Sequence, residues 1–299
     1  MTILNYDSTI DDDARRDRVY RGQIFLYSPR PAALSICAFA RELTEAAFAP
    51  LDPKTAQKEL SVERFAALLA VLKPQFIHHP RSKELVAQLL RELGCEPTQT
   101  YFDVPRLRTS TSDGYLSTGI SYAFHPHRDT WYSAPQCQIN WWLPVYDVEA
   151  ENVMAFHPAY WDRGALNGSR DYNYAEWNST SRLTAAQHIG KDTRKQPKAE
   201  EPLDVDHDVR VVPPVGGVMV FSAAQMHSTV PNTSGVTRFS IDFRTVHILD
   251  VRSRCGAPNV DSECTGTTMG DYLRVSDLAH IPDDLIQAYD TRKRAGVHR

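Results

Sequence analysis

Apolar residues in the first hundred positions recur at the three- and four-residue intervals that place them on one face of a helix. This spacing predicts three helices, over residues 31–47, 53–72 and 83–93. Asp52 is the expected N-cap of the second helix, with Pro53 in its first turn. Gly94 is expected to end the third helix. Residues 1–22 are polar and are expected to be loose, and a short apolar run follows at 24–27.

From Tyr101 the pattern changes to short β-type runs separated by Gly, Pro and Asn. Many short strands of this kind are typical of a sandwich or barrel, and strands that follow helices predict helices packed outside an antiparallel β core. The clearest runs span 119–124, 137–145, 153–157, 209–212, 218–222, 227–230 and 238–246. Along 137–145 the apolar residues alternate and share one face, namely Cys137, Ile139, Trp141, Leu143 and Val145.

These patterns predict a single domain over 1–299. It comprises a mostly helical region (1–100), a β core (101–250) and a C-terminal extension (251–299), whose last part, 266–299, is expected to hold one or two short helices. A polar insertion at about 160–208 interrupts the core. Insertions of this length are often functional, and a lid, a dimer contact and a surface excursion are all open interpretations.

Composition excludes several classes of function. Basic residues number 33 and acidic residues 37, a net charge of −4, which gives no electrostatic reason to expect nucleic-acid or membrane-surface binding. No apolar run approaches the roughly 20 residues of a bilayer span, and the N-terminal segment lacks the apolar centre of a signal peptide. The five cysteines indicate reduced thiols and a cytoplasmic protein. Only Cys255 and Cys264 are close in sequence, and no second ligand pair flanks them.

The candidate metal ligands are His127, Asp129 and His227. Two imidazoles and one carboxylate can occupy one face of an octahedral metal and leave the opposite face open, as in non-haem Fe(II) oxygenases. Residues two apart at the end of an extended strand point to the same side, so His127 and Asp129 can converge on one ion. His125 is a competing ligand, ranked second because the pair His125 and His127 would leave the triad without its carboxylate.

Arg238 follows His227 by eleven residues, on the next β run, and Ser240 follows on the same face. A guanidinium presents a planar fork that matches a carboxylate, and a hydroxyl can add a further donor. The pair suits the distal carboxylate of a dicarboxylic cosubstrate. The alternative is a strand arginine in a surface salt bridge.

Taken together, these motifs resemble the Fe(II)/2-oxoglutarate-dependent oxygenases, in particular the phytanoyl-CoA dioxygenase family. The resemblance covers roughly residues 119–246. It rests on the His127-Arg-Asp129 motif, Glu151-Asn152 with the run to His157-Pro158, the glycine-strand-His227 block of 216–227, and Arg238 with Ser240. It implies a mainly β fold, with a double-stranded β-helix (jelly-roll, cupin-like) core and a helical N-terminal region packed on it.

The resemblance also implies roles for individual residues. His127, Asp129 and His227 would hold Fe(II), and Arg238 would bind the C5 carboxylate of 2-oxoglutarate. Two further positions match the family less specifically. Thr229 corresponds to a hydroxyl often found near the cosubstrate, and Trp141 to an aromatic on the strand after the H-x-D motif, for which core packing is an equal alternative.

The implied reaction uses O2 and 2-oxoglutarate to hydroxylate, or to desaturate or cyclise, an unactivated C–H bond of a small molecule, with release of succinate and CO2. The family inclines toward specialised metabolism. The retained carboxylate of Asp129 disfavours halogenation, and Thr233 stands where nucleic-acid demethylases of this type have a second arginine. Val153, where many relatives have glycine, and the insertion after Pro158 depart from the family in the region of the substrate pocket.

The substrate-binding residues are less clearly marked. Four residues flank the metal motif, namely Arg106, Arg108, Tyr122 and Trp131. The arginines would suit an anionic substrate or lie at a solvated strand edge, and the aromatic residues could equally be core. Two other functions remain open: a cupin-type isomerase or hydrolase that uses another metal, and a non-catalytic barrel that binds a ligand. A homodimer is also open.

Overall fold

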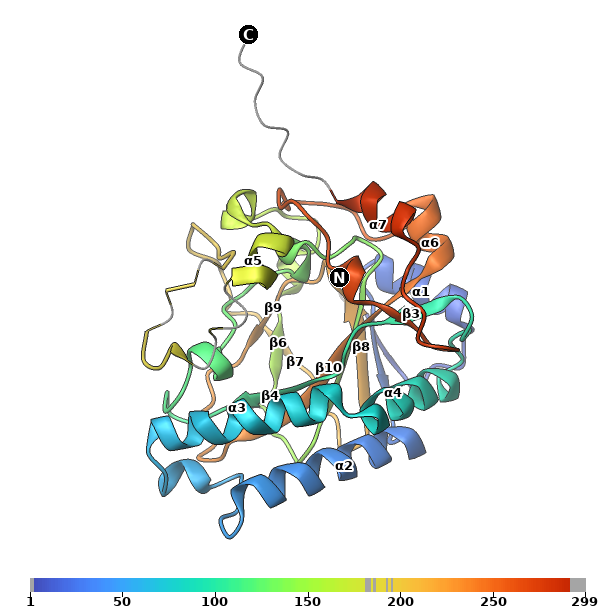
Figure 1. The fold of residues 1–299 in the computed structure, drawn as a ribbon. Coiled ribbons are helices and arrows are strands. Elements are labelled where there is room, and N and C mark those ends of the chain that lie inside the picture. Colours follow the sequence, from blue (N-terminus) through green and yellow to red (C-terminus); the bar gives the residue numbers. More distant parts are fainter. Residues whose placement is uncertain (1–2, 181–183, 185–186, 192, 195, 291–299) are drawn as a thin grey trace.

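The structure is a computed structural model that describes residues 3–180, 184, 187–191, 193–194 and 196–290. Within these residues a layer of helices covers one side of a large β-sheet, and a second, smaller sheet lies on the other side (Figure 1). No helix in this part of the chain is long and apolar enough to cross a membrane.

The helical layer contains α2 (Pro31–Phe48), α3 (Val62–His78) and α4 (Pro80–Glu92). The first helix is confirmed, but the prediction for the second is wrong at its start. Ser61 is the N-cap of α3, because its hydroxyl accepts from the Arg64 amide at 3.3 Å, whereas Asp52 accepts from Lys54 in a turn before the short 3-10 helix η1 (Ala56–Lys58). The third helix is confirmed and starts three residues early. Gly94 follows it with a φ of +77°.

The N-terminal segment is ordered, contrary to expectation. It forms β1 (Leu4–Tyr6), α1 (Asp12–Tyr20) and β2 (Ile24–Tyr27). The polar pattern was misleading because α1 buries Arg15 and Arg16, whose guanidiniums form ion pairs with Asp12. Arg16 also pairs with Asp250 at 2.7 Å, which joins α1 to the C-terminal part of the chain.

The larger sheet has eight strands in the order β1-β2-β8-β5-β10-β3-β11, with β4 also paired to β10. Apart from the parallel pair β1 and β2, neighbouring strands are antiparallel. The strands not yet given are β3 (Thr100–Phe102), β4 (Arg106–Ser110), β5 (Ile139–Pro144), β8 (Val218–Ser222), β10 (Arg238–His247) and β11 (Leu273–Arg274).

The smaller sheet has the order β7-β6-β9, with β6 (Met154–Phe156), β7 (Val209–Arg210) and β9 (His227–Thr229). Two sheets that enclose a cavity confirm the predicted jelly-roll class. The strand predicted over 119–124 is wrong: this segment starts with a 3-10 helix, η2 (Gly119–Ser121), and Gly119 has a φ of +58°, outside the β region.

The two faces of the larger sheet have different partners. The apolar face predicted along 137–145 is confirmed, because all five of its residues lie in the main core cluster with α2, α3 and α4. On the opposite face Trp142, Met219 and Phe221 pack in a second cluster with Phe156 of the smaller sheet. Alternation along each strand therefore directs one set of side chains to the helices and the other to the space between the sheets.

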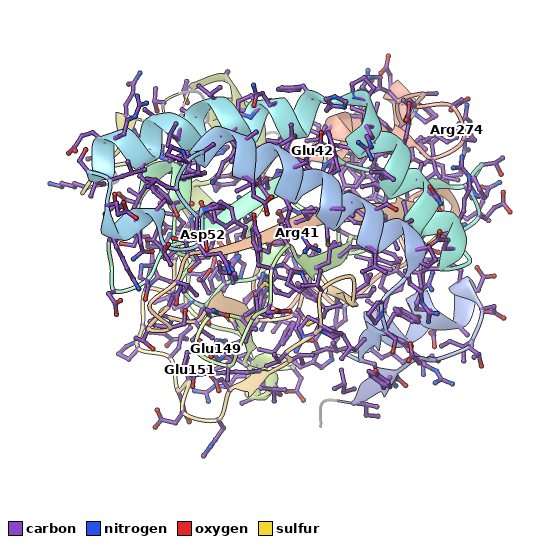
Figure 2. All side chains as sticks on the ribbon, turned by 90° about the horizontal axis from the view of Figure 1, so that it is seen from below. Arg41, Glu42, Asp52, Glu149, Glu151 and Arg274 are labelled. Atoms are coloured by element: carbon purple, nitrogen blue, oxygen red, sulfur yellow. The ribbon has the colours of Figure 1, made fainter. Side chains whose placement is uncertain are left out.

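The helical side is shown in Figure 2, where α2 and α3 run side by side across the sheet. Glu42 lies on the exposed side of α2, 3.7 Å from Arg81 of α4. The neighbouring Arg41 turns to the sheet instead, with its guanidinium 5.9 Å from the ring centre of Tyr146. Apart from Arg41, which lies over this aromatic ring, the side of α2 that faces the sheet is mostly apolar, with Ile36, Phe39 and Phe48 among its buried residues.

The remaining segments surround one end of the sheets. The insertion carries η4 (Pro158–Tyr160), η5 (Gly168–Asp171) and α5 (Tyr174–Thr180), and part of it lies outside the described residues. The helix α6 (Ile248–Ser253) follows β10, and η7 (Met269–Asp271) and α7 (Asp283–Tyr289) confirm the short helices predicted over 266–299. Cys255 and Cys264 are free thiols.

Candidate metal site

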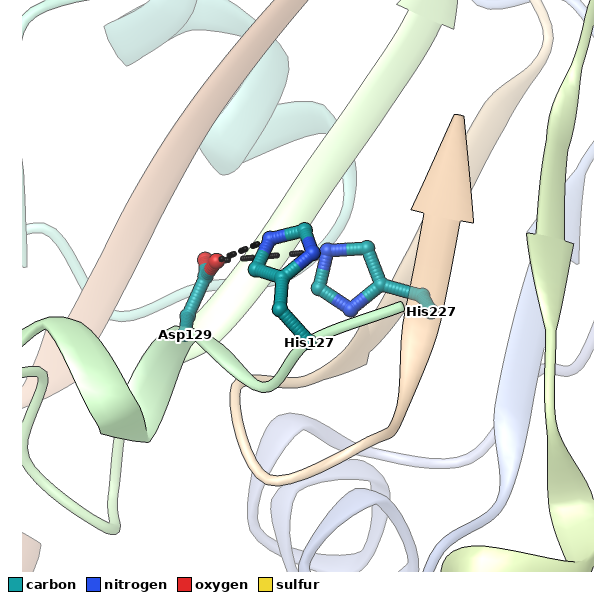
Figure 3. A group of neighbouring side chains, drawn as sticks. All are labelled: His127, Asp129 and His227. Atoms are coloured by element: carbon teal, nitrogen blue, oxygen red, sulfur yellow. Dashed lines mark ion pairs between the residues drawn. The ribbon is translucent and has the colours of Figure 1, made fainter. Parts of the chain in front are cut away.

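His127, Asp129 and His227 lie together at the mouth of the space between the sheets (Figure 3). The backbones of His127 and His227 pair in an antiparallel bridge with two hydrogen bonds of 2.9 Å, and Asp129 starts the 3-10 helix η3 (Asp129–Tyr132). Asp129 Oδ1 is 3.4 Å from His127 Nε2 and 3.9 Å from His227 Nε2. One donor atom from each residue lies within 4.8 Å of the other two, close enough to share one ion.

Backbone carbonyls orient both imidazoles. His127 Nδ1 is 2.8 Å from the carbonyl oxygen of His125, and His227 Nδ1 is 2.9 Å from that of Gln225. A carbonyl oxygen only accepts hydrogen bonds, so Nδ1 carries the proton in each ring and Nε2 keeps its lone pair. Both lone pairs are therefore available to a metal, in the arrangement that metal-binding histidines usually have.

The Asp129 carboxylate is oriented by its other oxygen. Oδ2 accepts hydrogen bonds from Asn140 Nδ2 at 2.9 Å and from Gln138 Nε2 at 3.2 Å. The hydroxyl of Tyr272 in turn donates to Gln138 Oε1 at 2.7 Å. With Oδ2 occupied, Oδ1 is the oxygen presented to the two histidines, and Asp129 is prepared to bind a metal through one oxygen.

The protonation states also suit a divalent cation. Burial alone would raise the pKa of Asp129, but its contact with His127 and the charge of Arg244 hold the pKa well below the ordinary value. Burial, together with the charge of His127, lowers the pKa of His227 to about 4. At neutral pH the site therefore offers a charged carboxylate and a neutral His227 imidazole, the forms that bind metals. His125, the competing ligand, is exposed and stands outside the cluster.

Arg128, between the two ligands of the H-x-D motif, fixes their backbone. Its side chain is 1% exposed and donates to the carbonyls of Ala224, Tyr160 and Arg163. Its Nε lies 3.1 Å from the carboxylate of Asp261. Through these contacts Arg128 joins the metal-binding loop to the segment before His227, to the insertion and to the segment that carries Asp261.

Arg238, the arginine of the predicted carboxylate anchor, lines the same cavity as the metal triad. Arg238 is 6% exposed, donates to the backbone carbonyl of Asn152 at 3.1 Å, and has its guanidinium 5.7 Å from the ring centre of Trp142. Burial lowers its pKa to about 10, so it is charged at neutral pH. Arg238 Nε and Ser240 Oγ are buried without a hydrogen-bond partner among the described residues. Such orphaned donors are costly unless a ligand accepts from them.

The cavity has a volume of about 380 Å³, within the usual range for small-molecule sites. It is lined by the metal triad, Arg238 and Thr229. The insertion contributes part of its wall through Tyr172, Tyr174 and Trp177. The metal ligands and the anchor therefore face one common space.

Of the four predicted substrate residues, the structure places Arg106, Arg108 and Tyr122 on the cavity wall. Trp131 is corrected: it is 0% exposed, packs in a cluster with Tyr160 and Met226, and donates to Asp261 at 2.7 Å.

Trp141 packs in the core and is also among the residues that line the cavity. Its indole stacks on Phe243 with ring centres 5.7 Å apart and donates to Thr245 Oγ1 at 2.8 Å, within the main core cluster. The aromatic residue beside Arg238 is its neighbour Trp142.

Sequence reasoning missed the residues that orient Asp129. A signal for Gln138, Asn140 and Trp142 was present, because they occupy the second face of the run 137–145 whose first face is apolar. Two polar amides on that face indicate a strand that borders a polar cavity. Tyr272 and Arg244 carried no such signal, because their contacts depend on how distant segments pack.

No family model and no curated protein match the chain. Among solved structures, EvdO2 from Micromonospora carbonacea var. aurantiaca, complexed with 2-oxoglutarate, is 13% identical over 80% of this chain and 92% of its own, with a TM-score of 0.45. The epimerase SnoN, in complex with Fe3+, alpha ketoglutarate and nogalamycin RO, is 15% identical over 79% and 85%, with a TM-score of 0.38. AviO1 from Streptomyces viridochromogenes Tue57 is 17% identical over 85% and 99%, with a TM-score of 0.38.

The ion pair of Arg128 with Asp261, next to the metal-binding loop, gives a first prediction. Asp261→Ala leaves the buried charge of Arg128 unpaired, so we expect the free energy of unfolding to fall by about 3–5 kcal/mol in urea denaturation. Asp277→Ala, which removes a half-exposed carboxylate, is the matched control and should leave the midpoint almost unchanged. A loss below about 1 kcal/mol for Asp261→Ala, the range of surface pairs, would contradict a structural role for this pair.

Metal binding gives a second prediction. Removal of a group that only hydrogen-bonds to a metal ligand already weakens metal binding by about 10–100-fold. His227→Ala removes a ligand itself, so it should weaken Mn(II) binding, measured by calorimetry, by more than that. His125→Ala is the control, because its ring is exposed and outside the cluster, and it should bind Mn(II) as the wild type does. If His125→Ala lost the metal and His227→Ala kept it, the ligand set would be wrong.

A third prediction concerns the orientation of Asp129. Asn140→Leu removes the shorter of the two hydrogen bonds to Oδ2, so the carboxylate can rotate, and Mn(II) affinity should fall by about 10–100-fold. The same substitution at the exposed Asn259 is the control. Unchanged affinity in a folded Asn140→Leu protein would show that Asp129 needs no support from β5.

Proposed function

We propose that this chain is an Fe(II)- and 2-oxoglutarate-dependent oxygenase that hydroxylates, desaturates or cyclises an unactivated C–H bond of a small molecule. One observation carries the proposal. The cavity lined by two histidines and a carboxylate is also lined by Arg238, whose Nε is a buried donor without a partner among the described residues. Ser240 Oγ, two residues further along β10, is a second such donor. A metal triad and a dicarboxylate anchor in one space are what this reaction requires.

The residues divide into two groups. His127, Asp129 and His227 would hold the iron, and three protein ligands leave positions for other molecules. Bound iron, with 2-oxoglutarate and O2, supplies the oxidant for C–H cleavage and yields succinate and CO2. Arg238 and Ser240 would bind the far carboxylate, and the backbone carbonyl of Asn152 holds the guanidinium in place for it.

The protein environment limits side reactions. Trp142 covers the guanidinium of Arg238, and Phe124 stacks on His127 with ring centres 5.0 Å apart, so aromatic rings flank both ends of the site. Tyr172, Tyr174 and Trp177 of the insertion add further aromatic rings to the cavity wall. These groups would keep water from the metal and hold the substrate in one orientation.

Several finer assignments belong to the same proposal. We place the whole chain, residues 1–299, in one catalytic domain that acts in the cytoplasm, and assign it to specialised metabolism as monomer or homodimer. Thr229 would lie beside the cosubstrate, since it faces the cavity from β9, where it pairs with Met154. A cupin-type hydrolase or isomerase does not require a carboxylate anchor such as Arg238 with Ser240. A protein that only binds a ligand does not require side-chain atoms oriented toward a metal.

Anaerobic addition of Fe(II) and 2-oxoglutarate tests the proposal, because chelation by the cosubstrate gives a visible metal-to-ligand charge-transfer band. We expect the band in the wild type and none in His127→Ala. Arg238→Met should raise the 2-oxoglutarate concentration needed by at least about 30-fold, the effect of a lost buried charge pair. Arg21→Met, at an exposed arginine, is the control. A folded wild-type protein that binds Fe(II) without this band would contradict the proposal and favour the other metal enzymes.

A further inference from the structure

The half of the cavity next to β4 carries an excess of positive charge. On the inner face of β4 and β10, three guanidiniums share two buried carboxylates. Arg108 contacts Asp242 at 2.8 and 3.2 Å, and Arg244 contacts the same carboxylate at 3.4 Å. Arg244 also lies 3.3 Å from Asp103, which forms the ion pair of Arg106. Each carboxylate thus forms ion pairs with two guanidiniums, because Arg244 contacts both Asp103 and Asp242.

Lys73 adds a further cation to this group. It extends from α3 into the cavity, where its ammonium donates to the backbone carbonyl of Ile120. Among the described residues it forms no ion pair. Burial and the nearby charge of Arg108 lower its pKa to about 7, although the charge of Asp242, which already pairs with Arg108 and Arg244, acts in the opposite direction. Arg194 of the insertion lines the same cavity.

The proposed cofactors do not compensate this excess. Fe(II), the Asp129 carboxylate, the 2-oxoglutarate dianion and the Arg238 guanidinium together sum to zero charge. When Lys73 is protonated, it and the three guanidiniums that share Asp103 and Asp242 are therefore left with two uncompensated positive charges. Buried charge of one sign is costly unless a ligand of the opposite sign binds beside it.

We propose that the substrate of this site is an anion, and that its carboxylate or phosphate group binds between Lys73 and Arg108. Calling this anion the substrate rests on the proposed function. Binding of the anion itself requires neither iron nor cosubstrate. The guanidinium of Arg108 lies 5.6 Å from the ring centre of Phe124, which stacks on His127. One aromatic ring thus separates the anion site from a metal ligand. Ile77 and Ile120 line the cavity nearby and would contact the carbon skeleton.

The test uses three small probes on the metal-free full-length chain, with affinity measured by calorimetry or ligand-observed NMR. Phenylacetate and phenyl phosphate carry the two candidate anions, and phenylacetamide is the neutral match. We expect at least one anion to bind about 10-fold or more tightly than the amide, the effect of one charge-assisted hydrogen bond. If phenyl phosphate binds more tightly, the substrate is assigned as a phosphate ester. If phenylacetate binds more tightly, it is assigned as a carboxylate.

Variants locate the anion. Lys73→Gln keeps a donor for Ile120 but removes the charge, and Lys73→Met is a second variant if the first does not fold. Either should abolish the preference for anions, whereas Lys58→Met, at an exposed lysine, should keep it. Arg238→Met should also keep it, because the cosubstrate anchor is a separate site.

The inference is overturned if the wild type binds the amide as well as the anions. It is also overturned if the preference for anions over the amide survives in the Lys73 variants and disappears in Arg238→Met. That result would place the anion at Arg238. Neither result depends on the charge-transfer band. A missing band with anion binding intact would contradict only the oxygenase, and a band without anion preference would contradict only the anionic substrate.

Discussion

The site depends on one constraint: three ligand side chains are held in their binding orientation by other protein groups before any metal arrives. Carbonyl oxygens hold Nδ1 of both histidines, and the amides of Asn140 in β5 and of Gln138 just before it hold Oδ2 of Asp129. Each contact occupies the atom that a metal would not use and leaves the other atom free. An ion can therefore bind with little reorganisation of the ligands, which is the usual advantage of a supported metal site.

Strand alternation connects this site to the stability of the fold. On β10, Phe239, Ile241 and Phe243 pack against the helical layer, while Arg238 and Ser240 point between the sheets. The same strand thus supplies part of the core and the proposed anchor. Because one face is fixed by core packing, the register of the other face is fixed as well, and a slip of one residue would exchange the two.

The sequence indicated the features that depend on local spacing. The H-x-D motif, the position of Arg238 and the apolar face through Trp141 could be read directly, because two residues at strand spacing share a side wherever the strand lies. The order of α1 could not be predicted, since it depends on Arg15 and Arg16 being buried against distant segments, where Arg15 donates to the carbonyl of Leu93 and Arg16 pairs with Asp250. The positive charge near Lys73 was also hidden, because α3, β4 and β10 are far apart in sequence.

The central claim is that one cavity binds iron at the triad and a dicarboxylate at Arg238. An anaerobic crystal structure with Fe(II) and 2-oxoglutarate tests it most directly. The account predicts iron bound by Nε2 of His127 and His227 and by one oxygen of Asp129, with the far carboxylate of 2-oxoglutarate accepting hydrogen bonds from Arg238 Nε and Ser240 Oγ. Iron bound by other side chains, or a cosubstrate carboxylate that does not contact Arg238, would contradict it.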